Sequence, residues 1–128
     1  MKKIVGTVVA VCALMLAGCV NNDPFGTAND PDTITIGSQD YYSNEIIAEI
    51  YAQALEKSGH KVKRELRIGQ REAYLPEIES GSIDLFPEYT GPLLQYWKKD
   101  TSARLPEDVY AELTKATPNG LRVLKQSP

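Results

Sequence analysis

Two hydrophobic periodicities alternate along most of this chain, and this alternation limits the folds open to it more than any other feature. Residues 33–36 are β-branched throughout and stop at Gly37, which is typical of a buried strand that ends in a tight turn. Residues 43–57 instead place apolar side chains at helical spacing, with Ser43 or Asn44 as the predicted N-cap. The positions predicted to face inward from this helix are Ile46, Ile47, Ile50, Tyr51, Ala54 and Leu55.

The same alternation continues toward the end of the sequence. The next segments are a strand with Val62, Leu66 and Ile68, a helix over Arg71–Ser80, and a short strand at Ile83–Phe86. Two helices follow, one with Leu93, Leu94 and Trp97 inward and one opened by Pro106 with Leu105, Val109, Tyr110 and Leu113 inward. A last strand begins at Leu121–Leu124. Strands that alternate with helices favour a largely parallel sheet with helices on both faces. The predicted fold class is therefore α/β.

Residues 1–32 are predicted to direct and tether the protein rather than to fold. Lys2 and Lys3 precede an apolar run over 4–16 that is too short to span a bilayer comfortably, as in a secretion signal. Leu16-Ala17-Gly18-Cys19 resembles the bacterial lipobox, in which the cysteine is acylated and the preceding residues are removed. We therefore expect a signal peptide over 1–18, a lipidated Cys19 within a flexible tether over 19–32, and a folded domain over 33–128. An unmodified signal with a chance cysteine is the alternative.

Charge and residue types exclude several classes of function. The 14 Lys and Arg side chains are outnumbered by 17 Asp and Glu, and no basic run could neutralise a series of phosphates, so nucleic acid is not an expected partner. Both cysteines, Cys12 and Cys19, precede the domain, so we expect neither a thiolate metal site nor a cofactor. His60 is the only histidine, and a carboxylate pair such as Asp84 and Glu88 is common, so we expect no enzyme.

Three predicted strand-to-helix loops carry the candidate site. In an open α/β sheet, ligands bind beyond the carboxyl ends of the strands, where the loops 37–42, 69–72 and 87–92 converge. These loops hold Ser38, Gln39, Asp40, Tyr41, Tyr42, Arg71, Glu72, Glu88, Tyr89 and Thr90. Tyrosine rings at this position can face a quaternary ammonium cation through their negative faces, or they can pack against the sheet edge.

Three segments resemble one known family. They are Ile36-Gly37-Ser38-Gln39, the helix Glu45–Gln53, and Gly81-Ser-Ile-Asp-Leu-Phe-Pro-Glu-Tyr-Thr-Gly91. In this order and spacing they are similar to the substrate-binding proteins of glycine betaine and choline ABC transporters, over about residues 33–125. The resemblance implies a type 2 periplasmic-binding fold, in which two α/β lobes close on a quaternary amine held by tyrosines and deliver it to a membrane permease. It implies ligand contacts from Tyr89, from Ser38 and Gln39, and from the neighbouring Thr90, on the extracytoplasmic face of the cell membrane.

The same resemblance shows two departures. Many relatives have Lys at the position of Gln39 and small residues at Gln70-Arg71-Glu72, so Arg71 becomes a candidate partner for a carboxylate, or it faces solvent. The chain also stops at Pro128, about where relatives enter their second lobe. We therefore expect a truncated first lobe that binds betaine weakly or not at all. The alternatives are a receptor for another small polar or aromatic solute, and a single-lobe surface lipoprotein with a protein partner.

Overall fold

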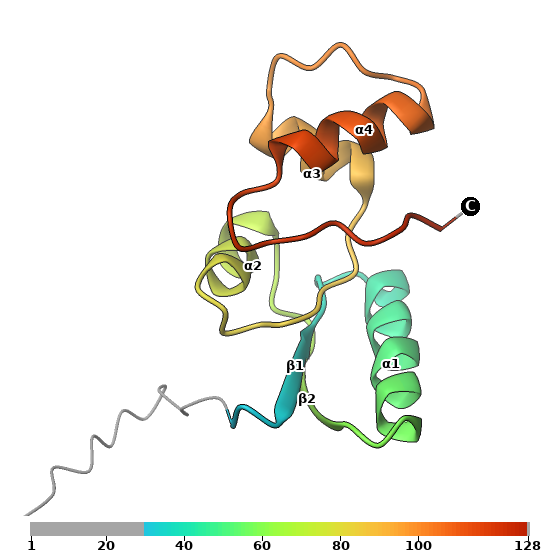
Figure 1. The fold of residues 1–128 in the computed structure, drawn as a ribbon, viewed down its shortest axis with the longest axis vertical. Coiled ribbons are helices and arrows are strands. Elements are labelled where there is room, and N and C mark those ends of the chain that lie inside the picture. The colour runs from blue at the N-terminus through green and yellow to red at the C-terminus, as the bar shows by residue number, and fades with distance from the viewer. Residues whose placement is uncertain (1–29, 128) are drawn as a thin grey trace, which may run out of the picture.

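The computed structural model describes residues 30–127, whose fold is shown in Figure 1. Its elements are, in chain order, β1 (Thr33–Gly37), α1 (Tyr42–Lys57), β2 (Lys61–Glu65), α2 (Arg71–Glu79), α3 (Thr90–Trp97) and α4 (Pro106–Ala116). β1 and β2 pair in parallel, from Thr33 opposite Lys61 to Gly37 opposite Glu65, and α1 connects them. The predicted α/β class with a parallel sheet is therefore confirmed. The predicted signal peptide, Cys19 and most of the predicted tether lie outside the described residues.

α1 packs against the sheet through its smallest side chains, Ala48 and Ala52. The cluster that we call the sheet core consists of Ile36, Ala48 and Ala52 with the partly buried Val62, Leu66 and Leu85. The prediction that Ile46, Ile50, Tyr51 and Ala54 face inward is wrong, because the first three are 42%, 59% and 44% exposed and Ala54 is exposed as well. Residues two apart lie about 200° apart around a helix, so the face that brings the alanines onto the strand turns Ile46 and Ile50 outward.

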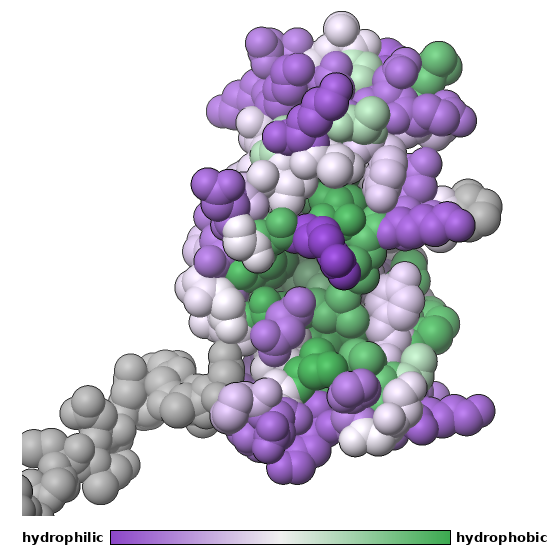
Figure 2. Space-filling model, viewed as in Figure 1, coloured by the Kyte–Doolittle hydropathy of each residue, from purple (hydrophilic) through white to green (hydrophobic). Residues whose placement is uncertain are grey.

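The outward face of α1 therefore carries apolar side chains. Tyr42, Ile46 and Ile50 follow one another at four-residue spacing, and all three are exposed. Figure 2 shows apolar residues gathered over the middle of the visible face, around β1 and α1, with hydrophilic residues at both ends of the molecule. Across residues 30–127, no helix combines the length and the apolar character needed to cross a membrane.

The predicted third strand at Ile83–Phe86 is reduced to a single bridge. Leu85 pairs in parallel with Ile36, on the edge of β1 that faces away from β2. Next to this bridge, the Thr35 N–H donates a hydrogen bond of 2.8 Å to Oδ2 of Asp84 rather than to a backbone carbonyl. The Asp84 side chain thus takes a ladder position that a regular strand would fill with backbone, and the pairing does not extend further.

The predicted strand at Leu121–Leu124 is wrong, since no strand follows α4 in the described part of the chain. Val123 packs instead against a cluster of helix residues. Tyr110 of α4 donates a hydrogen bond to the Leu124 carbonyl oxygen (3.2 Å). This segment therefore follows the helices and does not join the sheet.

A second hydrophobic cluster, which we call the helix core, joins α2, α3 and α4. Its buried members are Tyr74, Leu75, Leu93, Leu94, Val109 and Leu113. Trp97 is partly buried against it, as predicted. The prediction that Leu105 faces inward is wrong, because Leu105 is the exposed N-cap residue that precedes α4 rather than part of its inner face.

Candidate functional site

The three loops predicted to carry the site meet at one end of the sheet. A backbone hydrogen bond from the Asp40 N–H to the Gly69 carbonyl oxygen (3.3 Å) joins the first two loops, and the Ile68 N–H, just before the second loop, donates to the Ser38 carbonyl oxygen (3.0 Å). The third loop follows the Leu85 bridge on the other edge of β1, and it is shorter than the predicted range 87–92 because α3 begins at Thr90. Parallel pairing therefore gathers segments that are distant in the sequence.

Ser38 and Gln39 lie beneath the surface of this end, and both are buried. The Ser38 hydroxyl accepts a hydrogen bond from the Arg67 N–H (2.9 Å) and donates one to the Gln39 carbonyl oxygen (3.1 Å). Arg67 has a positive φ of 59°, which non-glycine residues rarely adopt, and the bond to Ser38 helps to hold that turn. Nε2 of Gln39 is buried without a hydrogen-bond partner. In this structure the two residues shape the loops and present little surface to a ligand.

Asn44 of α1 ties the first loop to the third. Its Oδ1 accepts a hydrogen bond from the Gln39 N–H (2.8 Å), and its Nδ2 donates one to the Pro87 carbonyl oxygen (2.8 Å). The prediction of Ser43 or Asn44 as N-cap is wrong, because α1 begins at Tyr42 without a side-chain cap. The sequence interpretation therefore missed the role of Asn44. The available signal is a polar residue on the helix face that carries the buried alanines.

Tyr89 and Thr90 stand where the third loop enters α3. Tyr89 is the N-cap residue of α3 and is 40% exposed, and its Oη lies 2.9 Å from Oγ of Ser43 at the start of α1. Thr90 is the first residue of α3 and is half-buried. From the first loop, the exposed Tyr41 donates a hydrogen bond to Oε1 of Gln70 (3.3 Å). Phenol rings from two loops therefore reach the surface at this end of the sheet.

Arg71 pairs with Glu88, the residue that precedes Tyr89. The two side chains are only 19% and 10% exposed, and Nε of Arg71 lies 2.8 Å from Oε1 of Glu88. Nη2 of Arg71 donates a hydrogen bond of 2.9 Å to Oε2, and the Tyr74 hydroxyl donates to Oε1. The sequence left two alternatives for Arg71, pairing with a carboxylate or facing solvent. The structure shows the first, and the carboxylate is that of Glu88 in the same chain.

The two side chains that donate to Glu88, those of Tyr74 and Arg71, have shifted pKa values. Burial raises the pKa of the Tyr74 phenol, and the hydrogen bond with Glu88 raises it further. Burial acts to lower the pKa of Arg71, but the hydrogen bond and the negative charge of Glu88 outweigh it, so the pKa of Arg71 is raised. Both groups therefore keep their protons at neutral pH and remain donors.

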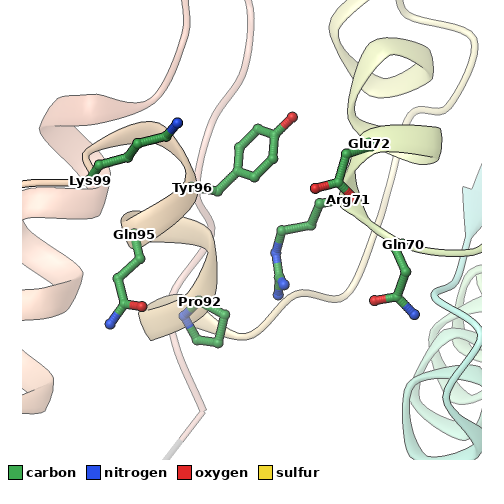
Figure 3. Close-up of a pocket in the computed structure, with 7 residues that line it drawn as sticks. All are labelled: Gln70, Arg71, Glu72, Pro92, Gln95, Tyr96 and Lys99. Atoms are coloured by element: carbon green, nitrogen blue, oxygen red, sulfur yellow. The ribbon is translucent and has the colours of Figure 1, made fainter.

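A hollow of about 430 Å³ opens between the start of α2 and α3, as Figure 3 shows. It is lined by Gln70, Arg71, Glu72, Pro92, Gln95, Tyr96 and Lys99. Tyr96 supplies the aromatic ring of this wall, and the charged side chains are of both signs. Such a lining suits a small polar solute better than a quaternary ammonium ion, which is attracted by several ring faces.

The residues considered for acid–base chemistry either take part in structural interactions or are exposed to solvent. Asp84 accepts the Thr35 N–H, Glu88 is held by Arg71, and His60 is exposed beyond the end of α1. In the described range 30–127, no group of three or more His, Cys, Asp or Glu side chains is placed to hold a metal ion. The site therefore offers aromatic surface and hydrogen bonds.

An α/β unit with tyrosines in the loops beyond its strand ends is typical of a small-molecule-binding lobe. A family model described as the substrate binding domain of ABC-type glycine betaine transport system matches residues 32–127, and the chain belongs to this family. Family members are binding proteins of transport systems and not enzymes, which confirms the resemblance and the expectation of no catalysis. The family binds small quaternary amines outside the cytoplasm and works with ABC transporter permeases.

A solved structure with a similar fold is apo YehZ from Escherichia coli, with a TM-score of 0.60 and 24% sequence identity. The match covers 65% of this chain and 30% of the YehZ chain. At this identity the similarity supports the fold alone, that of a periplasmic-binding-protein-like lobe. The matched region thus spans less than a third of the length of that structure.

Proposed function

We propose that the described domain supplies one lobe of a binding site for glycine betaine, choline or a related quaternary amine in an ABC importer. Family membership supports the transport role and the ligand class. The observation that carries the location of the site is Tyr89, whose exposed ring is hydrogen-bonded to Ser43 beyond the strand ends. A quaternary ammonium cannot donate hydrogen bonds and is attracted by aromatic faces, and a ring already held in place has less freedom to lose on binding.

The other candidate residues take different roles in this proposal. Tyr89 contacts the cation, and Thr90 lies beside it at the start of α3. Ser38 and Gln39 mainly support the loops and do not contact the ligand, because both are buried and the Ser38 hydroxyl is hydrogen-bonded to the neighbouring loop. Contact of either residue with ligand requires the first loop to open. Arg71 holds Glu88 and not a carboxylate of the ligand.

We propose further that this lobe alone binds the cation weakly and that a second lobe is needed to enclose it. Cation–π attraction is about 0.5–1 kcal/mol at exposed sites and about 2 kcal/mol or more when the cation is desolvated. Tyr89 is 40% exposed, so a cation at its ring would lie in the first of these two environments. A protein of the length of YehZ has room for a second lobe beyond the part matched here.

Nuclear magnetic resonance titration of the full chain with choline and glycine betaine tests the proposed site, because it detects weak binding residue by residue. We expect saturable shifts at the amides of residues 89–90 and their loss in Tyr89→Leu. Tyr96→Leu is the matched control, since Tyr96 is a tyrosine of similar exposure (39%) that lines the α2–α3 hollow. Binding that persists in Tyr89→Leu, or equal affinity for 3,3-dimethylbutanol, the uncharged analogue of choline, would overturn the proposal.

The α2–α3 hollow supports a second candidate, a receptor for another small polar solute. Within its lining, the cationic Lys99 and the amide Gln95 are not paired with Glu88 and suit a ligand with a carboxylate. Titration with amino acids separates the two candidates. Shifts at Gln95 and Tyr96 without shifts at Tyr89 favour the polar solute, whereas the reverse pattern with choline favours the quaternary amine.

We propose that Cys19 is lipidated and anchors the protein at the extracytoplasmic face of the membrane, where an ABC permease is its partner. The support is the signal-like sequence before Cys19, which lies outside the described residues. Labelling of bacterial cells with an alkyne fatty acid should mark the wild-type protein and Cys12→Ser, the matched control, but not Cys19→Ser. Equal labelling of Cys19→Ser would contradict the anchor.

A further inference from the structure

We propose that Arg71, Tyr74 and Glu88 form a positioning cluster that fixes the direction of Tyr89, so that ligand affinity depends on an ion pair that does not touch the ligand. The proposal rests on the proposed function of Tyr89 as a ligand contact. None of the three cluster residues needs to meet the ligand for this role.

Three donors from two parts of the chain meet on the Glu88 carboxylate. Arg71 donates from Nη2 to Oε2, Tyr74 donates from Oη to Oε1, and the backbone N–H of Tyr89 donates to Oε2. The first two donors belong to α2, whereas the third belongs to the N-cap residue of α3. The carboxylate therefore connects α2 directly to the backbone that carries the Tyr89 ring.

The Tyr89 side chain is held from both ends as a result. Its backbone has φ −92° and ψ 117°, and its carbonyl oxygen accepts a hydrogen bond from the Leu93 N–H (3.1 Å) of α3. At the other end, its Oη lies 2.9 Å from Oγ of Ser43 on α1. Release of Glu88 would remove the link from Tyr89 to α2. The ring would then be guided only by α3 and by one exposed hydroxyl contact.

The helix core makes the cluster rigid. Tyr74 is fully buried, and its ring stacks on Phe86 with centroids 4.1 Å apart and planes 17° apart. Because Phe86 stands two residues before Glu88, this stack constrains both partners of the Tyr74–Glu88 hydrogen bond. The direction of the phenol therefore follows from core packing.

Shielding from water makes the Arg71–Glu88 pair costly to break. Its side chains are 19% and 10% exposed, whereas the Arg67–Asp40 pair of the neighbouring loop is 64% and 49% exposed. Loss of one partner of a shielded pair leaves the other charge without compensation, while exposed pairs contribute little. The exposed Arg67 pair thus provides a matched control within the same end of the sheet.

The test removes one donor at a time from the full chain. Arg71→Met and Glu88→Gln abolish the ion pair, Arg71→Lys keeps the charge without the planar fork, and Tyr74→Phe removes one hydroxyl. Arg67→Met is the control. Two readouts are measured by nuclear magnetic resonance for each variant, namely hydrogen exchange of the Tyr89 amide and affinity for choline.

In Arg71→Met and Glu88→Gln, we expect the Tyr89 amide to exchange about tenfold faster and choline affinity to fall about fivefold, while the Leu113 amide of the helix core keeps its protection. Arg71→Lys should recover part of both effects, and Arg67→Met should show neither. If the Leu113 amide also loses its protection in Arg71→Met, the core itself is disturbed. The same two readouts in Tyr74→Phe, which keeps the ring stack, then test the proposal. Unchanged Tyr89 exchange, or unchanged affinity despite faster exchange, overturns the positioning role.

The same measurements separate this inference from the proposed function. A wild-type chain that binds no choline defeats the assigned function of Tyr89. The exchange of the Tyr89 amide and the proton–proton contact between Tyr89 and Ser43 still decide whether the cluster holds the ring.

Discussion

The Nδ2 group of Asn44 donates a hydrogen bond of 2.8 Å to the Pro87 carbonyl oxygen, in the interior of the domain. Pro87 directly precedes the cluster residue Glu88, so this bond fixes the third loop to α1 just as Glu88 fixes it to α2. Since Oδ1 of Asn44 also accepts the Gln39 N–H, one side chain sets the spacing of the first and third loops.

Removal of the Asn44 side chain should destabilise the domain. Asn44→Ala leaves the Gln39 N–H and the Pro87 carbonyl without partners, and each unpaired buried group costs about 1–3 kcal/mol. We expect the free energy of unfolding to fall by about 2–4 kcal/mol, measured by urea denaturation and Trp97 fluorescence. Gln95→Ala, which shortens an exposed amide on α3, should change it by less than about 0.5 kcal/mol. Equal stability of Asn44→Ala and wild type would refute this account of the loops.

Because of Arg64 in β2, the free energy of unfolding should decrease as the pH falls into the acid range. Its guanidinium donates to both carboxylate oxygens of Glu49 and of Glu56, at 2.7 to 3.1 Å, and these hydrogen bonds are the largest cause that lowers the pKa of each carboxyl. A carboxyl with a lowered pKa in the folded state adds stability above its unfolded pKa. That stability is lost as the pH falls through the folded pKa.

The measurement for Arg64 is the urea midpoint as a function of pH. It should decrease as the pH falls below the ordinary carboxyl pKa of 4.5, and the decrease should be smaller in Arg64→Met than in the wild type. Lys57→Met, which removes a positive charge from the end of α1, should keep the wild-type slope. Identical slopes for Arg64→Met and wild type would show that the hydrogen bonds from Arg64 to Glu49 and Glu56 do not contribute to the pH dependence of stability.

The two faces of α1 should respond differently to substitution. Ala48 is fully buried against the sheet, so Ala48→Leu must displace packed neighbours and should lower the free energy of unfolding by about 1–3 kcal/mol. Ile50 is 59% exposed, so Ile50→Gln should change it by less than about 0.5 kcal/mol. Thermal denaturation followed by circular dichroism measures both. A larger loss in Ile50→Gln than in Ala48→Leu would mean that the helix is rotated from the position described.

Two glycine-to-alanine substitutions should change the free energy of unfolding in opposite directions. A Cβ at Gly37 would lie 2.7 Å from Cδ2 of Phe86, and that ring cannot easily yield because it stacks on Tyr74, so Gly37→Ala should cost about 1–3 kcal/mol. Gly91 lies in the first turn of α3, and a Cβ added there would meet open space within 4 Å, so Gly91→Ala should stabilise by about 0.5–1 kcal/mol. Urea midpoints of both variants test this, and a stabilising Gly37→Ala would be inconsistent with the described contact.

Much of the element order could be predicted from local patterns. The strand at 33–37, the long helix after it, the inward face of α3, and Val109 and Leu113 on the inward face of α4 follow from residue type and spacing alone. The inward face of α1 does not, because it depends on how closely the helix approaches the strand, which favours Ala48 over the larger Ile46. The strand predicted at 121–124 fails for a similar reason, since Val123 finds its apolar partner in the helix core and not in the sheet.

The meeting of the three loops was predictable, whereas the bonds between them were not. Convergence of three loops beyond parallel strands places Tyr89, Ser38 and Arg71 near one another in general terms. The bonds that fix them, such as Asn44 to Pro87 and Arg71 to Glu88, join residues from different elements. Nothing in the local sequence around either partner indicates which distant group it will meet.

The hydrogen bond between Ser43 and Tyr89 crosses the boundary between the two hydrophobic cores. Ser43 belongs to α1, which packs on the sheet core, whereas Tyr89 is the N-cap residue of α3, which packs in the helix core. A tilt of the helical half against the sheet half would therefore change this contact, together with the buried hydrogen bond from Asn44 to Pro87. The distance between the Ser43 and Tyr89 side chains therefore reports the relative position of the two halves of the domain.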